Sequence, residues 1–303
     1  MRQCLACLAI VVLLSFAIAA DRAPSTYRID LDRPSRVGMK SQIEYFVTRT
    51  VRDEILQAGQ AKPSVVETTT TALLNVNWEV LSADERGNTL SQAMTVNSFT
   101  AIRNERESTI LPRGSRIVAT ATDTGTEFTV NGAAANDDVR SVLELIVGLS
   151  TAKRAVNLDQ LYGSAAPRQV GESWPLNIDN ISSAYARRGI NVKARDIEGE
   201  VRLVAVEPYA NELCLRISTQ EQFQSLTREP SSPRKGVSLI YNDDSTMTVR
   251  NEYWLPLFGE TKVLRVTSSS EATNSIQGTD NGVKFTDVQT VRHTGHTRRM
   301  PNR

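Results

Sequence analysis

Alternation of apolar and polar residues with a period of two is the main pattern in this chain. Over residues 66–80 the even positions are Val66, Thr68, Thr70, Ala72, Leu74, Val76, Trp78 and Val80. Such alternation is typical of a long strand with one apolar face. The segment Asp84-Glu85-Arg86-Gly87-Asn88 then predicts a turn, and residues 90–102 return as the second arm of a hairpin.

The same alternation continues through most of the remaining chain. It predicts further strands at residues 42–56, 116–122, 127–131, 197–207, 213–217, 237–241, 246–254, 262–268 and 283–293. We expect residues 116–122 and 127–131 to pair as a hairpin around Gly125. We expect 237–241 and 246–254 to do the same around the turn at 242–245. These two hairpins lie about 120 residues apart, which predicts a duplicated multi-strand unit.

One segment has the period of a helix. Its apolar residues follow the spacing i, i+3, i+4, i+7 and i+10, and they are Val139, Val142, Leu143, Ile146 and Leu149. This stripe predicts a helix over residues 138–150 that begins at Asp137 or Asp138, where a carboxylate caps the free amides. A second helix is predicted over residues 181–188, with Asn180 as its cap and Gly189 at its end.

Together these elements predict a mainly β (α+β) protein, with a large antiparallel sheet and one or two helices packed on it. Residues 21–178 would form a first β unit that includes the helix, and residues 196–292 a second β unit. Residues 179–195 would form a helical and basic connector. Residues 292–303 contain four arginines and no acidic residue, and we expect residues 293–303 to form a disordered basic tail.

The first 20 residues have the pattern of a cleaved signal peptide. Arg2 precedes an apolar run over residues 8–16, and Ala17-Ile18-Ala19 provides small residues at a cleavage site. The apolar run is shorter than the roughly 20 residues that a permanent transmembrane helix needs. We therefore expect a protein exported to the periplasm or beyond, and not an integral membrane protein.

The composition of the chain argues against stabilisation by disulfides and against nucleic-acid binding. Of the 3 cysteines, Cys4 and Cys7 lie in the leader, so Cys214 has no intramolecular disulfide partner and the core must stabilise the fold. With 35 basic and 34 acidic residues, the chain has a formal net charge of +1. It therefore lacks the broad basic field that nucleic-acid binding requires.

A short motif follows the predicted helix. The segment Gln169-Val170-Gly171-Glu172-Ser173-Trp174 resembles the valine-glycine-acidic-x-tryptophan motif of a group of exported bacterial β-rich proteins of unknown function. The order of strands, helix, motif and strands is also similar to the half-barrels of lipoprotein carriers. This resemblance implies a curved sheet or half-barrel. It assigns no catalytic residues, and we favour the interpretation of Gly171 and Trp174 as a tight turn with an aromatic plug.

Catalytic motifs are few. The two histidines, His293 and His296, both lie in the expected tail, and the mature part has no G-x-S-x-G, H-E-x-x-H, C-x-x-C or glycine-rich phosphate loop. Carboxylates are the remaining candidates, in the pairs Asp30/Asp32, Asp137/Asp138 and Asp243/Asp244. We therefore predict a non-enzymatic protein with no metal and no cofactor, and a carboxylate hydrolase only if two acids converge in a cleft.

The favoured hypothesis is that the protein binds an apolar or lipid-like molecule between the sheet and the first helix. The candidate contacts are Leu74, Val76 and Trp78 on the strand, and Val142, Leu143 and Ile146 on the helix. The simpler interpretation is that these six residues form the core. The alternative function is a structural or interaction protein of the cell envelope, which would contact a partner through exposed strand edges.

The core assignment of the helix can be tested by Ile146→Asp. An unpaired carboxylate among apolar side chains should lower the free energy of unfolding by several kcal/mol. Urea denaturation of the two proteins, followed by circular dichroism, measures this difference. An unchanged midpoint would contradict the assignment.

Overall fold

The alternating segments form unusually long strands. β2 (Lys40–Gln57), β3 (Ser64–Ala83) and β18 (Val283–Met300) contain 18, 20 and 18 residues. The structure is a computed structural model that describes residues 25–151, 153, 155–228, 237–241, 245–258, 262–280 and 283–300. The predicted signal peptide and most of the turn at 242–245 lie outside the described residues.

Each other predicted strand corresponds to a strand of the structure, but several are longer than predicted, and the short strands and α3 were not predicted. The long and medium strands are β4 (Thr89–Arg103), β6 (Arg116–Ala121), β7 (Thr126–Val130), β12 (Ile197–Tyr209), β13 (Glu212–Phe223), β15 (Val237–Tyr241), β16 (Thr246–Pro256) and β17 (Arg265–Asp280). The short strands are β1 (Thr26–Tyr27), β5 (Arg106–Thr109), β8 (Ala133–Ala134), β9 (Arg168–Gln169), β10 (Ser173–Pro175), β11 (Ile190–Asn191) and β14 (Thr227–Arg228). The helices are α2 (Asp137–Ile146), α3 (Leu158–Tyr162) and α4 (Ile178–Ala186), with a 3-10 turn at Ala194–Asp196.

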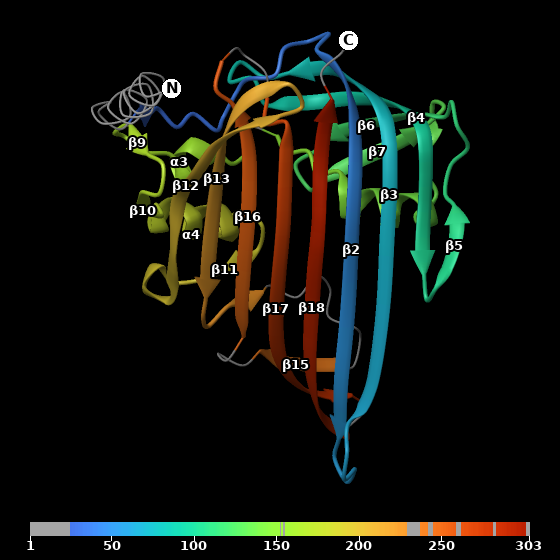
Figure 1. Cartoon of the computed structure of the whole chain (residues 1–303). Coiled ribbons are helices and arrows are strands. Elements are labelled where there is room, and N and C mark those ends of the chain that lie inside the picture. Colours follow the sequence, from blue (N-terminus) through green and yellow to red (C-terminus); the bar gives the residue numbers. More distant parts are fainter. Residues whose placement is uncertain are drawn as a thin grey trace, which may run out of the picture.

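One curved antiparallel sheet contains nearly all the strands, in the order β10-β12-β13-β16-β17-β18-β2-β3-β4-β6-β7-β8, with β5 beside β4 and β15 beside β17. The first and last long strands, β2 and β18, therefore lie side by side at its centre (Figure 1). Within the described residues the edge strands β10 and β8 do not pair, so the sheet is open. The prediction of a large antiparallel sheet with helices is confirmed, although α3 makes three helices in place of one or two.

The prediction of a disordered tail is wrong for residues 293–300. These residues form the second half of β18, paired with β2 from His293↔Arg49 to Met300↔Gln42 and with β17 on the other side. Arg298 lies on the exposed face of the strand, whereas Arg299 lies on the other face and is partly buried. The density of positive charge suggested a tail, but an exposed strand face accommodates such residues equally well.

The predicted hairpin between residues 237–241 and 246–254 is also wrong. β15 pairs with the end of β17, from Val237↔Asp280 to Tyr241↔Ile276, whereas β16 pairs with β13 and with the start of β17. β17 continues past Thr273, where its pairing with β16 stops, and β15 pairs with the backbone groups of this extension. The sequence echo of the β6–β7 hairpin therefore does not correspond to a second hairpin in the structure, which removes this support for a duplication.

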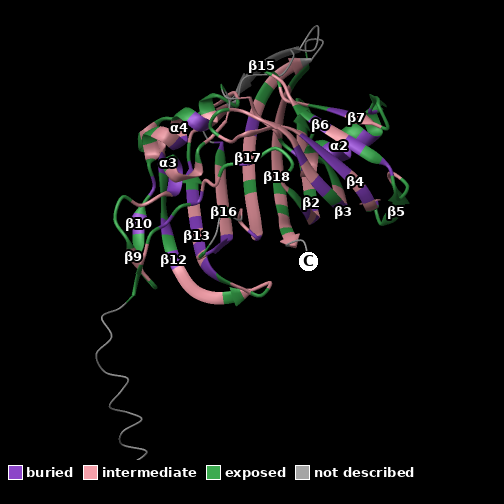
Figure 2. Ribbon diagram, turned by 90° about the horizontal axis from the view of Figure 1, so that it is seen from above, coloured by how far each residue is buried: buried purple, intermediate pink, exposed green. Residues whose placement is uncertain are grey.

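Both helical regions cover the same face of the sheet. Directly paired residues share a face, and one such row across the centre is Tyr253, Val266, Thr297, Tyr45 and Leu74. Figure 2 shows the sheet curving around this face, with α2 at one flank and α3 and α4 at the other. The concave face thus has two covered flanks and a more open centre.

Each flank has its own apolar core. The core under α2 contains Ile43, Ala72, Leu74, Val76, Trp78, Val80, Met94, Val96, Phe99, Ala101, Ile117, Ala119, Phe128, Ala135, Val139, Val142, Leu143 and Val147. The core under α3 and α4 contains Leu161, Trp174, Ile181, Val201, Leu203, Leu215, Ile217, Phe223 and Leu255, together with Ile29 and Leu31 from the N-terminal segment. The second core therefore draws residues from both predicted β units.

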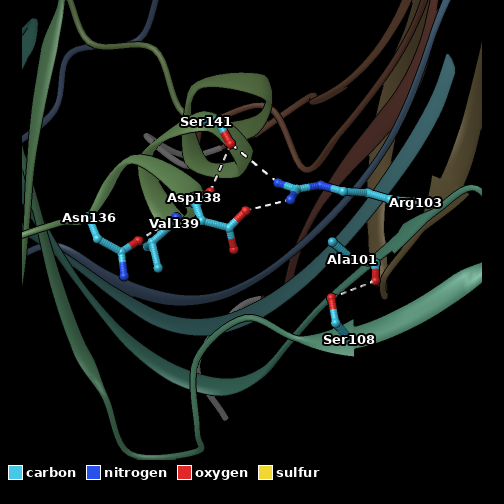
Figure 3. A network of polar contacts seen from close by, with 7 residues as sticks. All are labelled: Ala101, Arg103, Ser108, Asn136, Asp138, Val139 and Ser141. Carbon is cyan, nitrogen blue, oxygen red and sulfur yellow. Dashed lines mark hydrogen bonds and ion pairs between the residues drawn. The ribbon is translucent and has the colours of Figure 1, made fainter.

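The start of α2 differs from the prediction by one residue. The cap is Asn136, whose side-chain Oδ1 accepts a hydrogen bond from the Val139 amide at 2.9 Å. Asp138 instead forms an ion pair with Arg103 of β4, and Arg103 also donates to the Ser141 hydroxyl at 3.3 Å (Figure 3). Asparagine and aspartate are equally good caps, so the sequence could not choose between them. The ion pair attaches the helix to the sheet.

Removal of the β18 segment should unfold the protein. A chain truncated after Arg292 loses the pairs that join β18 to both β2 and β17 over residues 293–300. We expect loss of the cooperative thermal transition, measured by circular dichroism. Deleting only residues 301–303 removes none of these pairs and serves as the control. A truncated protein that unfolds at the same temperature as the control would contradict this strand assignment.

Candidate functional site

A hollow lies on the concave face, between the two helical flanks. Its volume is about 530 Å³, which is within the roughly 300–1,000 Å³ range of small-molecule sites. Leu149, from the segment after α2, lines one side, and Leu158, Leu161 and Tyr185 line the other. Strands β16 and β17 contribute Val249, Asn251, Tyr253 and Ser268 to the floor. The hollow thus exists because both flanks rise from one curved sheet.

A second cavity of about 330 Å³ adjoins the hollow. Asp32, Leu158, Tyr253 and Lys262 line both. The smaller cavity reaches the ends of the central strands, where Val266, Thr297 and Arg299 form part of its lining. The two cavities together therefore combine an apolar wall with a charged end.

The charged end contains three basic side chains, Arg33, Lys262 and Arg299, and each is partly buried. Burial and the nearby positive charge of Arg299 lower the pKa of Lys262 to about 8, opposed by the negative charge of Asp32. Burial also lowers the pKa of Arg299. The guanidinium of Arg299 lies over the Trp78 ring, 4.4 Å from its centre. These positive charges are thus placed where water solvates them poorly.

A buried carboxylate anchors the helices on the other side of the hollow. Glu221 of β13 is 0% exposed. It accepts hydrogen bonds from the Tyr162 hydroxyl at 2.5 Å and from the Tyr185 hydroxyl at 3.3 Å. Burial raises the pKa of Glu221, and the two hydroxyl donors and Arg188 partly oppose that rise. This network connects α3 and α4 to the sheet. The sequence analysis did not identify it, because β13 shows only one charged residue on an otherwise apolar face.

The six predicted ligand contacts lie together in the core under α2. Leu74, Val76, Trp78, Val142 and Leu143 are 0–4% exposed, and Ile146 is partly buried against the same cluster. None of the six lines the hollow or the adjoining cavity. Trp78 also donates from its indole nitrogen to Gln92 Oε1 at 2.7 Å. Binding of a ligand among these six residues stays a prediction, and in the structure they pack against one another.

The Gly171 and Trp174 motif stabilises α3, which forms part of the wall of the hollow. Gly171 has a φ of +92°, which favours glycine, and it forms the turn before β10. Trp174 is 4% exposed, and its indole nitrogen donates to the Tyr162 backbone carbonyl at 2.9 Å. The motif therefore holds the end of α3, and with it the tyrosine that binds Glu221.

The two histidines point to opposite faces of β18, since their positions on the strand differ by three, an odd number. His296 stacks on Phe46, and His293 lies on the concave side, where burial lowers its pKa. In the part of the chain that the structure describes, no three His, Cys, Asp or Glu side chains are grouped to hold a metal. Cys214 is buried, and burial raises its pKa to about 11.

Two acids, Asp30 and Asp159, lie close to each other. Asp159 accepts hydrogen bonds from the amides of Leu31 at 2.6 Å and Asp32 at 3.2 Å. It therefore anchors the N-terminal segment to α3. Neither Asp30 nor Asp159 lines either cavity, whereas Asp32 lines both.

Comparisons with known proteins show no family. No family model matches the chain, and no curated protein matches it either. Among solved structures, the chain is similar to lipovitellin, with 6% identity and a TM-score of 0.34 over 88% of this chain and 26% of that one. It is also similar to OpdQ of Pseudomonas aeruginosa, with 7% identity and a TM-score of 0.25 over 86% and 98% of the two chains.

A porin of Rhodopseudomonas blastica, in a triple mutant, shares 9% identity with a TM-score of 0.19 over 86% of this chain and 100% of that one. The chain spans about a quarter of the length of lipovitellin. Among the described residues, no helix has the length and apolar character needed to cross a membrane. The function therefore has to be argued from the geometry of the site.

Replacing Glu221 by glutamine should change how stability depends on pH. The pKa of Glu221 is raised in the folded protein, so folding favours its protonated form. That stabilisation is fully present below the unfolded-state pKa of about 4.3 and is lost as the pH rises through the folded-state value. Glu221→Gln should therefore gain thermal stability relative to the wild type as the pH rises from 4 to 8.

Melting temperatures of the two proteins across this range measure the effect. Glu198→Gln provides the control, because Glu198 is exposed on the opposite face of the adjacent strand. A constant difference between Glu221→Gln and wild type at every pH would contradict a raised pKa.

Proposed function

We propose that this protein is an exported, non-enzymatic binding protein that holds one lipid-like molecule in the hollow of its curved sheet. The observation that carries the proposal is the hollow of about 530 Å³, lined by Leu149, Leu158, Leu161 and Val249. Apolar walls of this kind bind an acyl chain through the area removed from water, at roughly 25 cal/mol per Å². The ligand site thus lies between the two flanks, and not under α2.

The lining also favours an amphipathic ligand over a purely apolar one. The polar side chains of Arg188, Asn251 and Ser268 line the same space as the aliphatic side chains. A ligand that left these groups without hydrogen-bond partners would bind less well. A molecule with one polar end and one acyl chain satisfies both parts of the lining.

The proposal predicts that affinity rises with acyl length. Each additional buried methylene contributes about 0.8 kcal/mol, which is about a fourfold change in Kd. Isothermal titration of the mature protein with alcohols and fatty acids of six to twelve carbons, below their micelle concentrations, measures this trend. Native mass spectrometry of protein purified from its own host gives an independent measurement, as an added mass of lipid size.

Ala155→Trp is the variant that blocks the hollow, since Ala155 is part of its lining. We expect weaker binding by at least tenfold. Ala61→Trp is the matched control, because Ala61 is exposed in the turn between β2 and β3. Binding that is independent of chain length, or equal in the two variants, would contradict the proposed site.

One observation favours the alternative function in envelope interactions. β2 and β3 extend as a hairpin beyond the neighbouring elements (Figure 1), and Val65 and Val66 on it are 52% and 56% exposed. Exposed apolar residues on a projecting hairpin are suited to contact another protein. Val65→Ser with Val66→Ser would disturb such a contact without affecting the hollow, so the two functions can be separated experimentally.

A further inference from the structure

Two basic side chains lie together at one end of the paired cavities, far apart in the sequence. Lys262 precedes β17, and Arg299 lies near the end of β18. The Arg299 amide donates to the Leu264 carbonyl at 2.7 Å, which brings the two segments side by side. Both side chains line the smaller cavity of about 330 Å³. Their proximity is therefore built into the backbone of the sheet.

Among the described residues, no ion pair within 4.0 Å includes Lys262 or Arg299. Asp32 is the one carboxylate in the lining of the smaller cavity, and burial raises its pKa. Arg33 lines the same cavity and donates to the Pro256 carbonyl at 2.7 Å. The lining therefore has an excess of positive charge.

Such an arrangement is unfavourable without an anion. Two like charges in a poorly solvated space repel each other, and the charge of Arg299 contributes to the low pKa of Lys262. Desolvation of an unpaired charge is costly, and an anion that binds both groups offsets that cost. The geometry is thus better suited to a bound anionic group than to an empty site.

Trp78 helps to place the guanidinium of Arg299. The central carbon of the guanidinium lies over the Trp78 ring, 4.4 Å from the ring centre, and Trp78 is itself held by its hydrogen bond to Gln92. The N–H donors of a guanidinium match the oxygens of a carboxylate or phosphate. Trp78, which the sequence analysis assigned to an apolar contact, therefore positions the basic group.

We propose that Lys262 and Arg299 bind the acidic head group of the ligand, a carboxylate or a phosphate ester, and that its acyl chain extends into the adjoining hollow. This inference rests on the proposed function, since it names the ligand class of the same site. Leu158 and Tyr253 line both cavities and provide the apolar surface between the head and the chain. Thr297 places a hydroxyl beside the head group.

The test compares three ligands that share one chain and differ in the head. Decanoate, decyl phosphate and decanol are titrated calorimetrically into the mature protein at pH 7. We expect at least one of the two anions to bind tenfold or more tightly than the neutral alcohol. Whichever anion binds more tightly identifies the head group as carboxylate or phosphate. Equal affinity for all three would overturn the head-group proposal and leave the proposed function standing, whereas no binding of any would overturn both.

Two variants assign the effect to the named residues. Arg299→Gln and Lys262→Gln should each weaken binding of the preferred anion by tenfold or more and leave binding of decanol within twofold. Arg298→Gln is the matched control, since Arg298 is the neighbouring exposed residue on the opposite face of β18. Loss of decanol binding together with the anion, or an equal loss in the control, would overturn the assignment. Because the three-ligand comparison uses the wild type, the proposal stays testable even if a variant does not fold.

Discussion

The pairing of β18 with β2 is the interaction on which the rest of this structure depends. Sixteen residues of β18, from Phe285 to Met300, pair in continuous register with a strand more than 200 positions earlier in the chain. This ladder joins the N-terminal and C-terminal strands into one sheet, so a single curvature runs from one flank to the other. Since both helical flanks rise from that sheet on the same face, the hollow between them is a direct consequence of the pairing.

The two flanks hold their helices by different means. α2 packs a fully apolar stripe on its core and is attached at its start by the ion pair of Arg103 and Asp138. The opposite flank instead contains the buried carboxylate of Glu221, which two tyrosine hydroxyls from α3 and α4 solvate. A buried polar group is tolerated only with such partners, so the network restricts how these helices sit on the sheet. That restriction keeps the wall of the hollow in place.

Some side chains near the site also belong to the apolar cores of the two flanks. Trp78 belongs to the core under α2, yet its ring also orients Arg299 toward the cavity. Tyr253 lies on the central row of the concave face and lines both cavities. Packing on the flanks and chemistry at the centre are therefore coupled through shared side chains. This coupling explains why the proposed ligand site adjoins the predicted apolar residues without containing them.

Local features of this protein can be predicted from the spacing of its apolar residues. The period of two predicted the long strands but not the short strands of two to four residues, since alternation shows over several residues which face of a strand is buried. The stripe from Val139 to Ile146 predicted α2 for the same reason. The spacing did not predict α3, a five-residue helix too short to show a period. Which strands pair depends on the tertiary structure, because the register between distant segments is set by the whole sheet. β15 pairs with β17, and residues 293–300 pair with β2. The tertiary structure also brings together the residues of the site. Lys262, Arg299 and Glu221 lie far apart in the sequence. Only the curved sheet brings Lys262 and Arg299 to one cavity and places Glu221 beneath the two tyrosines that line the hollow.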